Sequence, residues 1–401
     1  MLAPVAGRTH LFFAMSHFAF GEVALALRLA WQLHDRGDRV VFLTPSGISV
    51  LFERTPFKHG EIDAVWGAID QVVPEVAAEH RCDSVVVVDA ASLYLALHVA
   101  RRSSAFLREL SMPVIAFDVW NLPETNLAWD TGPEVWRLPP EAAAFAHRLC
   151  PVPFIRPDPA PGRYNALPAP AHGDRERVRS ELGLATGDQL LLTTTASWQH
   201  ALPSDYHRHL VEVVPPLVLS HLSQLDSRVR VLHVGPQALV DAHVLGSRYK
   251  WLPRVNAERM MSLLVAADLC VTLNAAATTI SSAIALDLPV VLGINSHSGQ
   301  TAESLAMHVE SPRTRAMLPR LAPLMPFAVW PLGLHTFLAP VLRDNPYLDA
   351  VSTVELLDED AFVSTCQRLL AEPAEARSRM ARYRALVANL PTAADVFESY
   401  L

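Results

Sequence analysis

The sequence predicts an α/β protein built from two doubly wound, parallel-sheet domains. Its 401 residues exceed the roughly 250–300 residues beyond which a single core stops growing. Short apolar segments alternate with helical patterns in both halves, and a proline-rich stretch separates the halves. Hydrophobic residues make up 51% of the chain and charged residues 18%, so we expect a buried core in each half.

In the first half, the elements follow a strand–helix–strand order. Apolar runs of strand length are separated by segments with apolar residues at helical spacing, which favours parallel strands covered by helices. We expect strands at His10–Met15, Val40–Thr44, Ser84–Asp89 and Pro113–Phe117, and helices at Gly21–Arg36 and Ala90–Leu110.

The second half repeats the same order, which predicts a second doubly wound domain. The expected strands are Gln189–Thr195, Val229–Val234, Leu269–Leu273 and Val290–Ile294, and the expected helices are Tyr206–Ser223, Ala257–Ala267 and Thr278–Leu286.

The domain boundary is placed at a change in composition. The segment Pro151–Gly173 is rich in proline and predicts a stiff, non-helical connector. We therefore divide the chain into a first domain (1–160), a linker (161–185), a second domain (186–380) and a C-terminal helix (381–401) expected to pack back on the first domain. The proline-rich segment 317–347 has no assigned structure: a substrate-side lid and an oligomer contact, such as a homodimer interface, both stay open.

Charge, cysteines and hydropathy exclude several classes of protein. The net charge of −8 and the absence of a Lys/Arg cluster argue against a nucleic-acid partner. The four cysteines stand singly, without C-x-x-C spacing, and are expected to be reduced thiols of a cytoplasmic protein. No apolar run approaches the roughly 18 residues of a transmembrane segment, and the apolar run after His10 is too short for a signal peptide.

Ligands of open α/β sheets bind outside the carboxyl ends of the strands, so the loops after the strands carry the functional argument. The loop Ser16–Glu22 follows the first expected strand, and Asp89 ends the third. The run from Gly21 to Phe42 resembles the Gly-His…Arg-Gly-His-x-Val opening of UDP-sugar-dependent GT-B glycosyltransferases. The run from Cys82 to Ile115 is similar to their Pro-Asp-x-Val-x-x-Asp…Pro-Val segment.

A third resemblance lies in the second half. The run from Ala267 to Leu292 resembles the donor motif of this family and is closest in spacing to the bacterial lipid-linked N-acetylglucosaminyltransferases. The resemblance implies the GT-B fold, in which two Rossmann-like domains face a cleft. The first domain would then lie on the acceptor side and the second would bind the nucleotide donor.

On the acceptor side, the sequence differs from the family at the position of the catalytic base. The family's catalytic His is replaced by Glu22, which can act as a base if burial raises its pKa, or can merely favour the helix dipole. The neighbouring His17 is the other candidate base, or else a structural hydrogen-bonding residue. Asp89 corresponds to the family's orienting Asp and would raise the pKa of Glu22, orient His17, or simply cap the next helix.

On the donor side, small residues and hydroxyls precede a helix N-terminus, a pattern that suits a diphosphate. The family's glycine is replaced by Ala276 and its ribose-binding Glu by Ser282. The resemblance assigns Ser197, Thr278 and Thr279 to the diphosphate. It also implies donor-binding positions at Trp251, Leu252, Arg254, Asn274, Ser282, His297 and Gln300.

These features predict a glycosyltransferase that moves a sugar from a nucleotide-diphosphate donor to a small-molecule or lipid acceptor, in bacterial natural-product or glycoconjugate biosynthesis. Because we see no Asp-x-Asp motif on a strand-end loop, we expect neither a metal nor a cofactor beyond the nucleotide sugar. Two alternatives stay open: a catalytically silent GT-B partner or activator subunit, and a GT-B enzyme of another reaction, such as a sugar-nucleotide epimerase or hydrolase.

Overall fold

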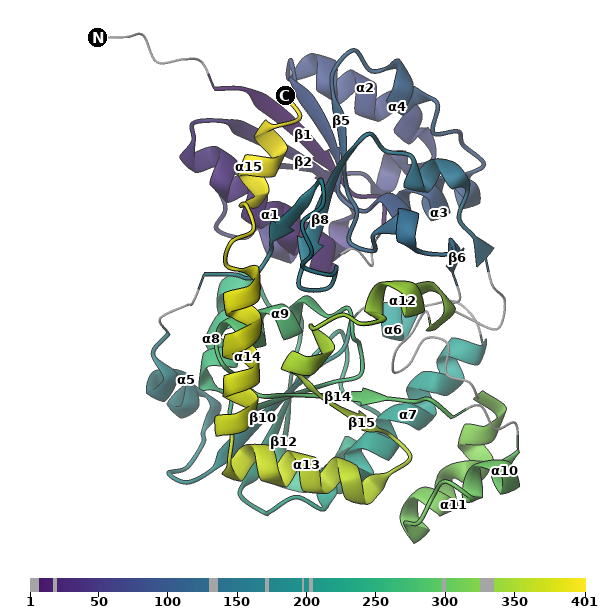
Figure 1. The fold of residues 1–401 in the computed structure, drawn as a ribbon, viewed down its shortest axis with the longest axis vertical. Coiled ribbons are helices and arrows are strands. Elements are labelled where there is room, and N and C mark those ends of the chain that lie inside the picture. Colours follow the sequence, from purple (N-terminus) through teal and green to yellow (C-terminus); the bar gives the residue numbers. More distant parts are fainter. Residues whose placement is uncertain are drawn as a thin grey trace.

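The computed structural model describes residues 7–16, 20–129, 136–169, 173–196, 198–201, 205–297, 301–324 and 335–401. They form two α/β domains stacked one above the other, and the end of the chain returns to the first domain (Figure 1). The fold class predicted from the sequence is confirmed.

The first domain is built on a seven-stranded sheet in the order β3-β2-β1-β4-β5-β8-β9, with every neighbouring pair parallel. Its strands are β1 (Thr9–Phe13), β2 (Arg39–Thr44), β3 (Lys58–Glu61), β4 (Ser84–Val87), β5 (Val114–Phe117), β8 (His147–Val152) and β9 (Arg163–Asn165). The helices are α1 (Phe20–Asp35), α2 (Ile69–Glu79), α3 (Ala90–Ala100) and α4 (Phe106–Glu109), with short 3₁₀ helices η1 (Ser46–Phe52), η2 (Asp63–Ala68), η3 (Leu122–Glu124) and η4 (Pro140–Ala143). A two-stranded antiparallel ribbon joins β6 (Ala128–Trp129) to β7 (Trp136–Arg137).

The second domain carries a six-stranded parallel sheet in the order β12-β11-β10-β13-β14-β15. Its strands are β10 (Gln189–Thr194), β11 (Val229–Val234), β12 (Tyr249–Leu252), β13 (Leu269–Thr272), β14 (Val290–Ile294) and β15 (Ser352–Glu355). Its helices are α5 (Arg175–Leu182), α6 (Trp198–Ala201), α7 (Asp205–Ser223), α8 (Ala257–Ala266), α9 (Thr278–Ala285), α10 (Ala302–Ala306), α11 (Pro312–Leu321), α12 (His335–Leu342), α13 (Glu359–Ala371), α14 (Ala374–Val387) and α15 (Ala393–Glu398), with 3₁₀ helices η5 (Ala242–Arg248), η6 (Ala322–Leu324) and η7 (Leu348–Ala350).

Strand order explains where a ligand site belongs. In the first sheet the chain reverses its direction of travel between β1 and β4, and in the second sheet between β10 and β13. Crevices of doubly wound sheets open at such switch points, outside the carboxyl ends of the two strands. The segments that follow β1, β4, β10 and β13 are the same ones from which the sequence analysis drew its candidates.

One apolar core runs through both domains. Successive residues of β10 point to opposite faces of the sheet: Leu190 and Leu192 join the core that continues into the first domain, whereas Leu191 joins a second core on the opposite face. Because α8 and α9 contribute to the continuous core, the two domains meet over apolar surface.

Two sequence expectations about local structure differ from the structure. The proline-rich connector contains β9, whose three residues pair with β8, and β8 itself runs into the connector as far as Val152. The expected helix Ala90–Leu110 is two helices, because Arg101 adopts a left-handed conformation (φ 54°) that ends α3.

The C-terminal segment returns across both domains (Figure 1). Arg384 of α14 forms an ion pair with Asp287 beside α9, and α15 contacts α1, β8 and β9 of the first domain. Phe397 is fully buried there, 5.0 Å from the ring of His10.

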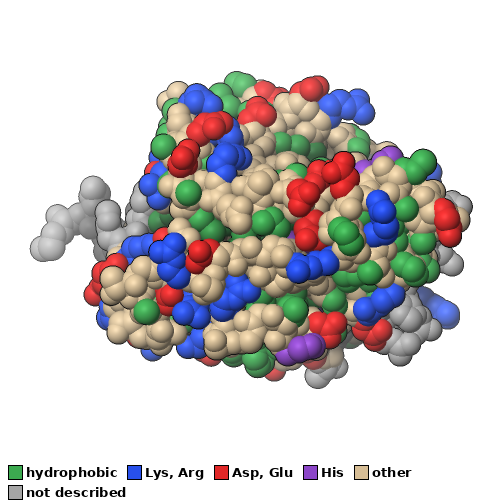
Figure 2. Space-filling view, turned by 90° about the horizontal axis from the view of Figure 1, so that it is seen from below, with side chains coloured by type: hydrophobic (Ala, Val, Ile, Leu, Met, Phe, Trp, Pro, Cys, Tyr) green, Lys and Arg blue, Asp and Glu red, His purple; other side chains and the backbone are tan. Residues whose placement is uncertain are grey.

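On the face shown in Figure 2, basic and acidic side chains are interspersed. Among the residues that the structure describes, no helix is both long and apolar enough to cross a bilayer. The four cysteines are free and buried.

Candidate functional site

A narrow pocket lies between the two domains, where the N-termini of α1 and α9 meet. A Cβ atom placed on Gly21 would stand 3.1 Å from Cγ2 of Thr278, so the first turns of the two helices are in contact. The cavity measures about 40 Å³. Its lining comes from both domains: Glu22, Leu25, Val119, Trp120, Pro151, Pro153, Phe154, Ala166, Ala276, Ala277, Thr278, Ser281 and Tyr347.

Glu22 places a carboxyl group in this pocket from the first turn of α1. Burial is the largest cause that raises the pKa of Glu22, and the nearby charge of Asp89 adds to it, so that the pKa rises to about 8. A base is most effective when its pKa lies near the working pH. Glu22 therefore has the property that the sequence analysis required of a catalytic carboxylate.

Asp89 follows β4 and caps α3, accepting a hydrogen bond from the backbone N of Ser92 at 3.1 Å. Its side chain is buried, and desolvation raises its pKa despite this hydrogen bond. Asp89 therefore caps α3 and also lies close enough to Glu22 to raise its pKa.

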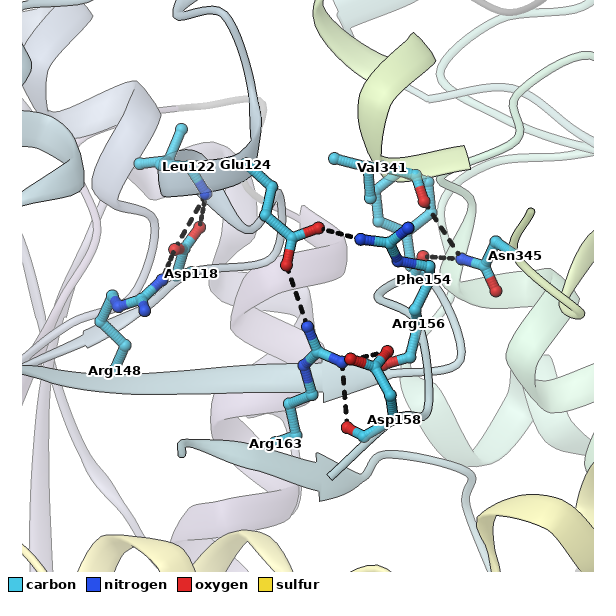
Figure 3. A network of polar contacts seen from close by, with 10 residues as sticks. All are labelled: Asp118, Leu122, Glu124, Arg148, Phe154, Arg156, Asp158, Arg163, Val341 and Asn345. Carbon is cyan, nitrogen blue, oxygen red and sulfur yellow. Dashed lines mark hydrogen bonds and ion pairs between the residues drawn. The ribbon is translucent and has the colours of Figure 1, made fainter. Parts of the chain in front are cut away.

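Asp118 is a third carboxylate that the sequence analysis missed. It comes directly after β5, lies 1% exposed, and adds to the rise in the pKa of Asp89. Both of its oxygens accept from the backbone N of Leu122 at 3.0 Å, and Arg148 donates to Oδ2 at 2.9 Å (Figure 3). An acidic residue at a strand end was the signal available in the sequence.

On the other side of the pocket, the segment between β13 and α9 is held by its own polar groups. The side chain of Asn274 accepts from the backbone N of Ala276 at 3.0 Å, and the hydroxyl of Tyr347 donates to the carbonyl of Ala275 at 2.7 Å. Ala277 precedes α9 and provides no side-chain cap. The first N–H groups of α9 thus have no capping side chain, and Thr278 lies beside them in the pocket.

Comparison with known proteins identifies the family. The model described as "Family of unknown function (DUF6365)" matches residues 29–401. The chain belongs to this family. A search of curated proteins finds no match.

The DUF6365 chain is similar in structure to GT-B glycosyltransferases. HepE of Anabaena, solved in complex with UDP-glucose, is 13% identical with a TM-score of 0.52, and the match covers 98% of each chain. The calicheamicin glycosyltransferase CalG4 is 15% identical with a TM-score of 0.53 over 99% of each chain. VinC, in complex with dTDP, is 13% identical with a TM-score of 0.52 over 98% of each chain. At these identities the similarity establishes the GT-B fold.

Ser282 of the DUF6365 chain lies at the domain interface and not in the lining of the pocket. It is 5% exposed and donates to the carbonyl of Thr278 at 3.3 Å, while Nη2 of Arg28 approaches its oxygen at 3.5 Å. Arg28 also donates to the carbonyl of Ala166 at 2.8 Å. Ser282, which the resemblance to UDP-sugar-dependent glycosyltransferases assigned to the donor, supports a contact between the domains. Thr279, next to Thr278, does not line the pocket either.

The candidate nucleobase segment lies at the end of β12. Trp251 is 38% exposed and its ring N–H donates to the carbonyl of Gly235 at 3.0 Å. Leu252 accepts from the backbone N of Gly235 at 3.2 Å. Arg254 reaches across to the first domain and donates to the carbonyl of Gly47 at 3.0 Å.

His297 faces Glu355, with Nε2 and Oε2 3.7 Å apart, and its ring stacks on His308 at 4.7 Å. The remaining candidates, His17, Ser197 and Gln300, lie outside the described residues.

An Asp-x-Asp sequence, Asp358-Glu359-Asp360, is separated by two residues from β15, a strand that the sequence analysis did not include. Only Asp358 lies in the loop, because α13 begins at Glu359. Asp358 caps α13 and Glu359 accepts hydrogen bonds from Ser311 and Thr314. Across the described part of the chain, no three His, Cys, Asp or Glu side chains gather as a metal site requires.

Ion pairs brace the wall of the pocket formed by Pro151–Phe154. Glu124 accepts from Arg156 at 2.5 Å and from Arg163 at 3.0 Å, and Arg163 also pairs with Asp158 (Figure 3). From the second domain, Asn345 donates to the carbonyl of Phe154 at 2.7 Å. Both domains therefore fix the backbone that faces Glu22.

Proposed function

We propose that this chain is a glycosyltransferase that moves a sugar from a nucleotide-diphosphate donor to a hydroxyl of a small-molecule or lipid acceptor, with Glu22 as the general base. The observation that carries the proposal is the meeting, in one interdomain pocket, of a carboxyl group with a pKa near 8 and the uncapped N-terminus of α9. The carboxyl group can take the proton of the acceptor hydroxyl, and the helix N-terminus can bind the leaving diphosphate.

In the proposed step, the carboxylate of Glu22 takes the proton of the acceptor hydroxyl. The acceptor oxygen forms a bond to the anomeric carbon of the sugar as the bond from that carbon to the diphosphate oxygen breaks. The nucleoside diphosphate leaves with the electron pair of that bond. The proton then rests on Glu22, the sugar on the acceptor oxygen, and the electron pair on the nucleoside diphosphate.

The leaving diphosphate gains charge in this step. The N–H groups and the partial positive charge at the start of α9, together with the hydroxyl of Thr278, would stabilise it. We therefore propose turnover without a divalent cation, which assays in excess EDTA test directly.

The size of the pocket limits its role. A cavity of about 40 Å³ has room for only a few water molecules, whereas ligand sites of drug-sized molecules measure about 300–1,000 Å³. The nucleotide would then lie along the neighbouring strand ends of the second domain, where Trp251 and Arg254 are found. The complexes of HepE with UDP-glucose and of VinC with dTDP support a donor of this class.

The test is release of nucleoside diphosphate from a panel of UDP- and dTDP-sugars, with candidate acceptors present. Glu22→Gln keeps the shape of the side chain but cannot accept the proton, so we expect turnover to fall about 10²–10⁴-fold. Glu53→Gln, on the exposed surface, serves as the matched control, and His17→Ala tests the other candidate base. Unchanged turnover in Glu22→Gln would remove Glu22 from the reaction.

A second reaction class is favoured by one observation. With a pKa of about 8, Glu22 carries its proton in most molecules at pH 7, beside a second carboxyl group at Asp89. Such a pair suits the acid/base chemistry of a sugar-nucleotide epimerase or hydrolase. Nucleoside diphosphate released without any glycosylated acceptor would support that class, and no nucleotide binding at all would support a catalytically silent partner subunit.

A further inference from the structure

A second hollow lies on the second domain, outside the interdomain pocket. It is a groove of about 710 Å³ bounded by α13, α14 and the chain from Pro346 to Val354. Its volume falls within the range of about 300–1,000 Å³ that is typical of small-molecule sites. The proposed transfer reaction uses none of its lining residues.

One face of α14 forms a wall of the groove. Arg379, Arg382, Tyr383 and Leu386 line it, and their spacing of three and four residues places them on the same side of the helix. Arg368 of α13 joins them. The fold thus places three arginines from two helices around one hollow.

The charge of the groove is opposite to that of the whole chain. Its lining contains three arginines and a single acidic residue, Asp349, and Glu375 pairs with Arg379 from outside the lining. One net positive charge remains, whereas the chain carries a net charge of −8. A positively charged concavity on an acidic protein attracts anions to that place.

Arg379 makes two hydrogen bonds within the protein. Nη2 donates to the hydroxyl of Ser352 at 2.8 Å and Nη1 donates to Glu375 at 3.1 Å. Its Nε is buried and is therefore out of reach of a ligand in the groove. Arg368 and Arg382, which are exposed, are the arginines that remain to bind an anion.

The groove also offers apolar contact. Leu386, at the same wall, is 50% exposed. Exposed leucine beside arginine suits a ligand with an anionic group and an organic body.

From these observations we propose that the groove binds a soluble small molecule that carries a phosphate group. The positive charges of Arg368 and Arg382 suit an anionic phosphate group, and the planar guanidinium fork matches the spacing of phosphate oxygens. This site is separate from the proposed transfer site, and its occupation does not depend on the proposed reaction.

The test uses the full chain and inorganic phosphate as the probe. Phenylglyoxal modifies accessible arginines, and peptide mass spectrometry reports each one separately. We expect phosphate to protect Arg368 and Arg382 while Arg377, exposed on α14 but outside the groove, is modified at an unchanged rate. Equal protection of all three, or protection of none, would overturn the proposal.

A binding measurement compares variants inside and outside the groove. By calorimetry, Arg368→Ala/Arg382→Ala should bind phosphate at least about tenfold more weakly than the parent chain, whereas Arg377→Ala should bind as the parent does. Circular dichroism confirms that each variant is folded. Lipid headgroups also carry phosphate, so the experiment includes vesicles that contain phosphatidic acid. If the parent chain sediments with these vesicles and the double variant does not, the choice of a soluble ligand is overturned.

Discussion

Glu22→Gln should make the protein more stable at neutral pH. The carboxyl group has an ordinary pKa of 4.5 and a pKa of about 8 in the folded chain. Between these values the unfolded chain has lost the proton while the folded chain keeps it, so stability is highest below pH 4.5 and falls as the pH rises toward 8. Glutamine has the same shape and no charge, and removes this loss.

The magnitude follows from the two values. At pH 7 the distance from 4.5 is roughly 2.5 pH units, and at about 1.36 kcal/mol per unit the upper bound is about 3.4 kcal/mol. Because Asp89 titrates together with Glu22, part of this energy belongs to the pair, and we expect a gain of about 2–3 kcal/mol. At pH 5 the same arithmetic leaves less than about 1 kcal/mol.

The assay is thermal unfolding of the parent, Glu22→Gln and Glu53→Gln chains at pH 5 and pH 7. A gain of about 2–3 kcal/mol corresponds to a rise in Tm of about 2–4 °C, at about 1.2 °C per kcal/mol for 401 residues that unfold together, seen at pH 7 and nearly absent at pH 5. Equal Tm values for parent and Glu22→Gln at pH 7 would show that the carboxyl group is not held protonated, and would remove the physical basis of the base assignment. A gain in stability with a loss of turnover is the expected signature of a strained functional group.

Three further predictions follow from the same contacts. Asp89→Asn retains a good helix cap but removes the repulsive charge, so the acidic limb of the pH–rate profile should move down by about one pH unit or more; an unmoved limb would contradict the coupling. Thr278→Val keeps the side-chain shape and removes the hydroxyl, so nucleoside diphosphate should bind about tenfold more weakly by calorimetry, whereas equal affinity would take Thr278 off the diphosphate. Tyr347→Phe deletes the hydrogen bond to Ala275 and leaves a carbonyl unpaired, so urea denaturation should show a loss of about 1–3 kcal/mol; no loss would mean that water replaces the hydroxyl.

Most of the fold was predictable because its central strands are buried on both faces. Strands such as β1 and β4 read as continuous apolar runs, and each is followed by a clear helical pattern. The edge strand β3, with the sequence Lys-His-Gly-Glu, has no such signal. The three-residue β9 lies among prolines, and only its pairing with β8 defines it.

The site residues that could be predicted are those whose reactive side chains lie in the segments that follow strands. Glu22, Asp89 and Thr278 lie at the starts of the helices that come next after strands, so the topology of parallel sheets brought them toward the cleft. Tyr347 was not predictable, because its contact with Ala275 joins residues 72 positions apart and depends on how α12 and η7 pack. The groove on α14 was missed for the same reason: the spacing of Arg379 and Arg382 indicates a shared helix face, but not the hollow beside it.

The docking of α15 on the first domain bears on how this protein is made. Phe397 of α15 packs beside the ring of His10, and the hydroxyl of Tyr400 donates to the carbonyl of Arg148. During synthesis, the first domain therefore cannot complete its core until residues 393–400 have left the ribosome. A chain terminated before residue 393 should expose the surface around His10, and a host's quality-control proteases would have access to the half that was translated first.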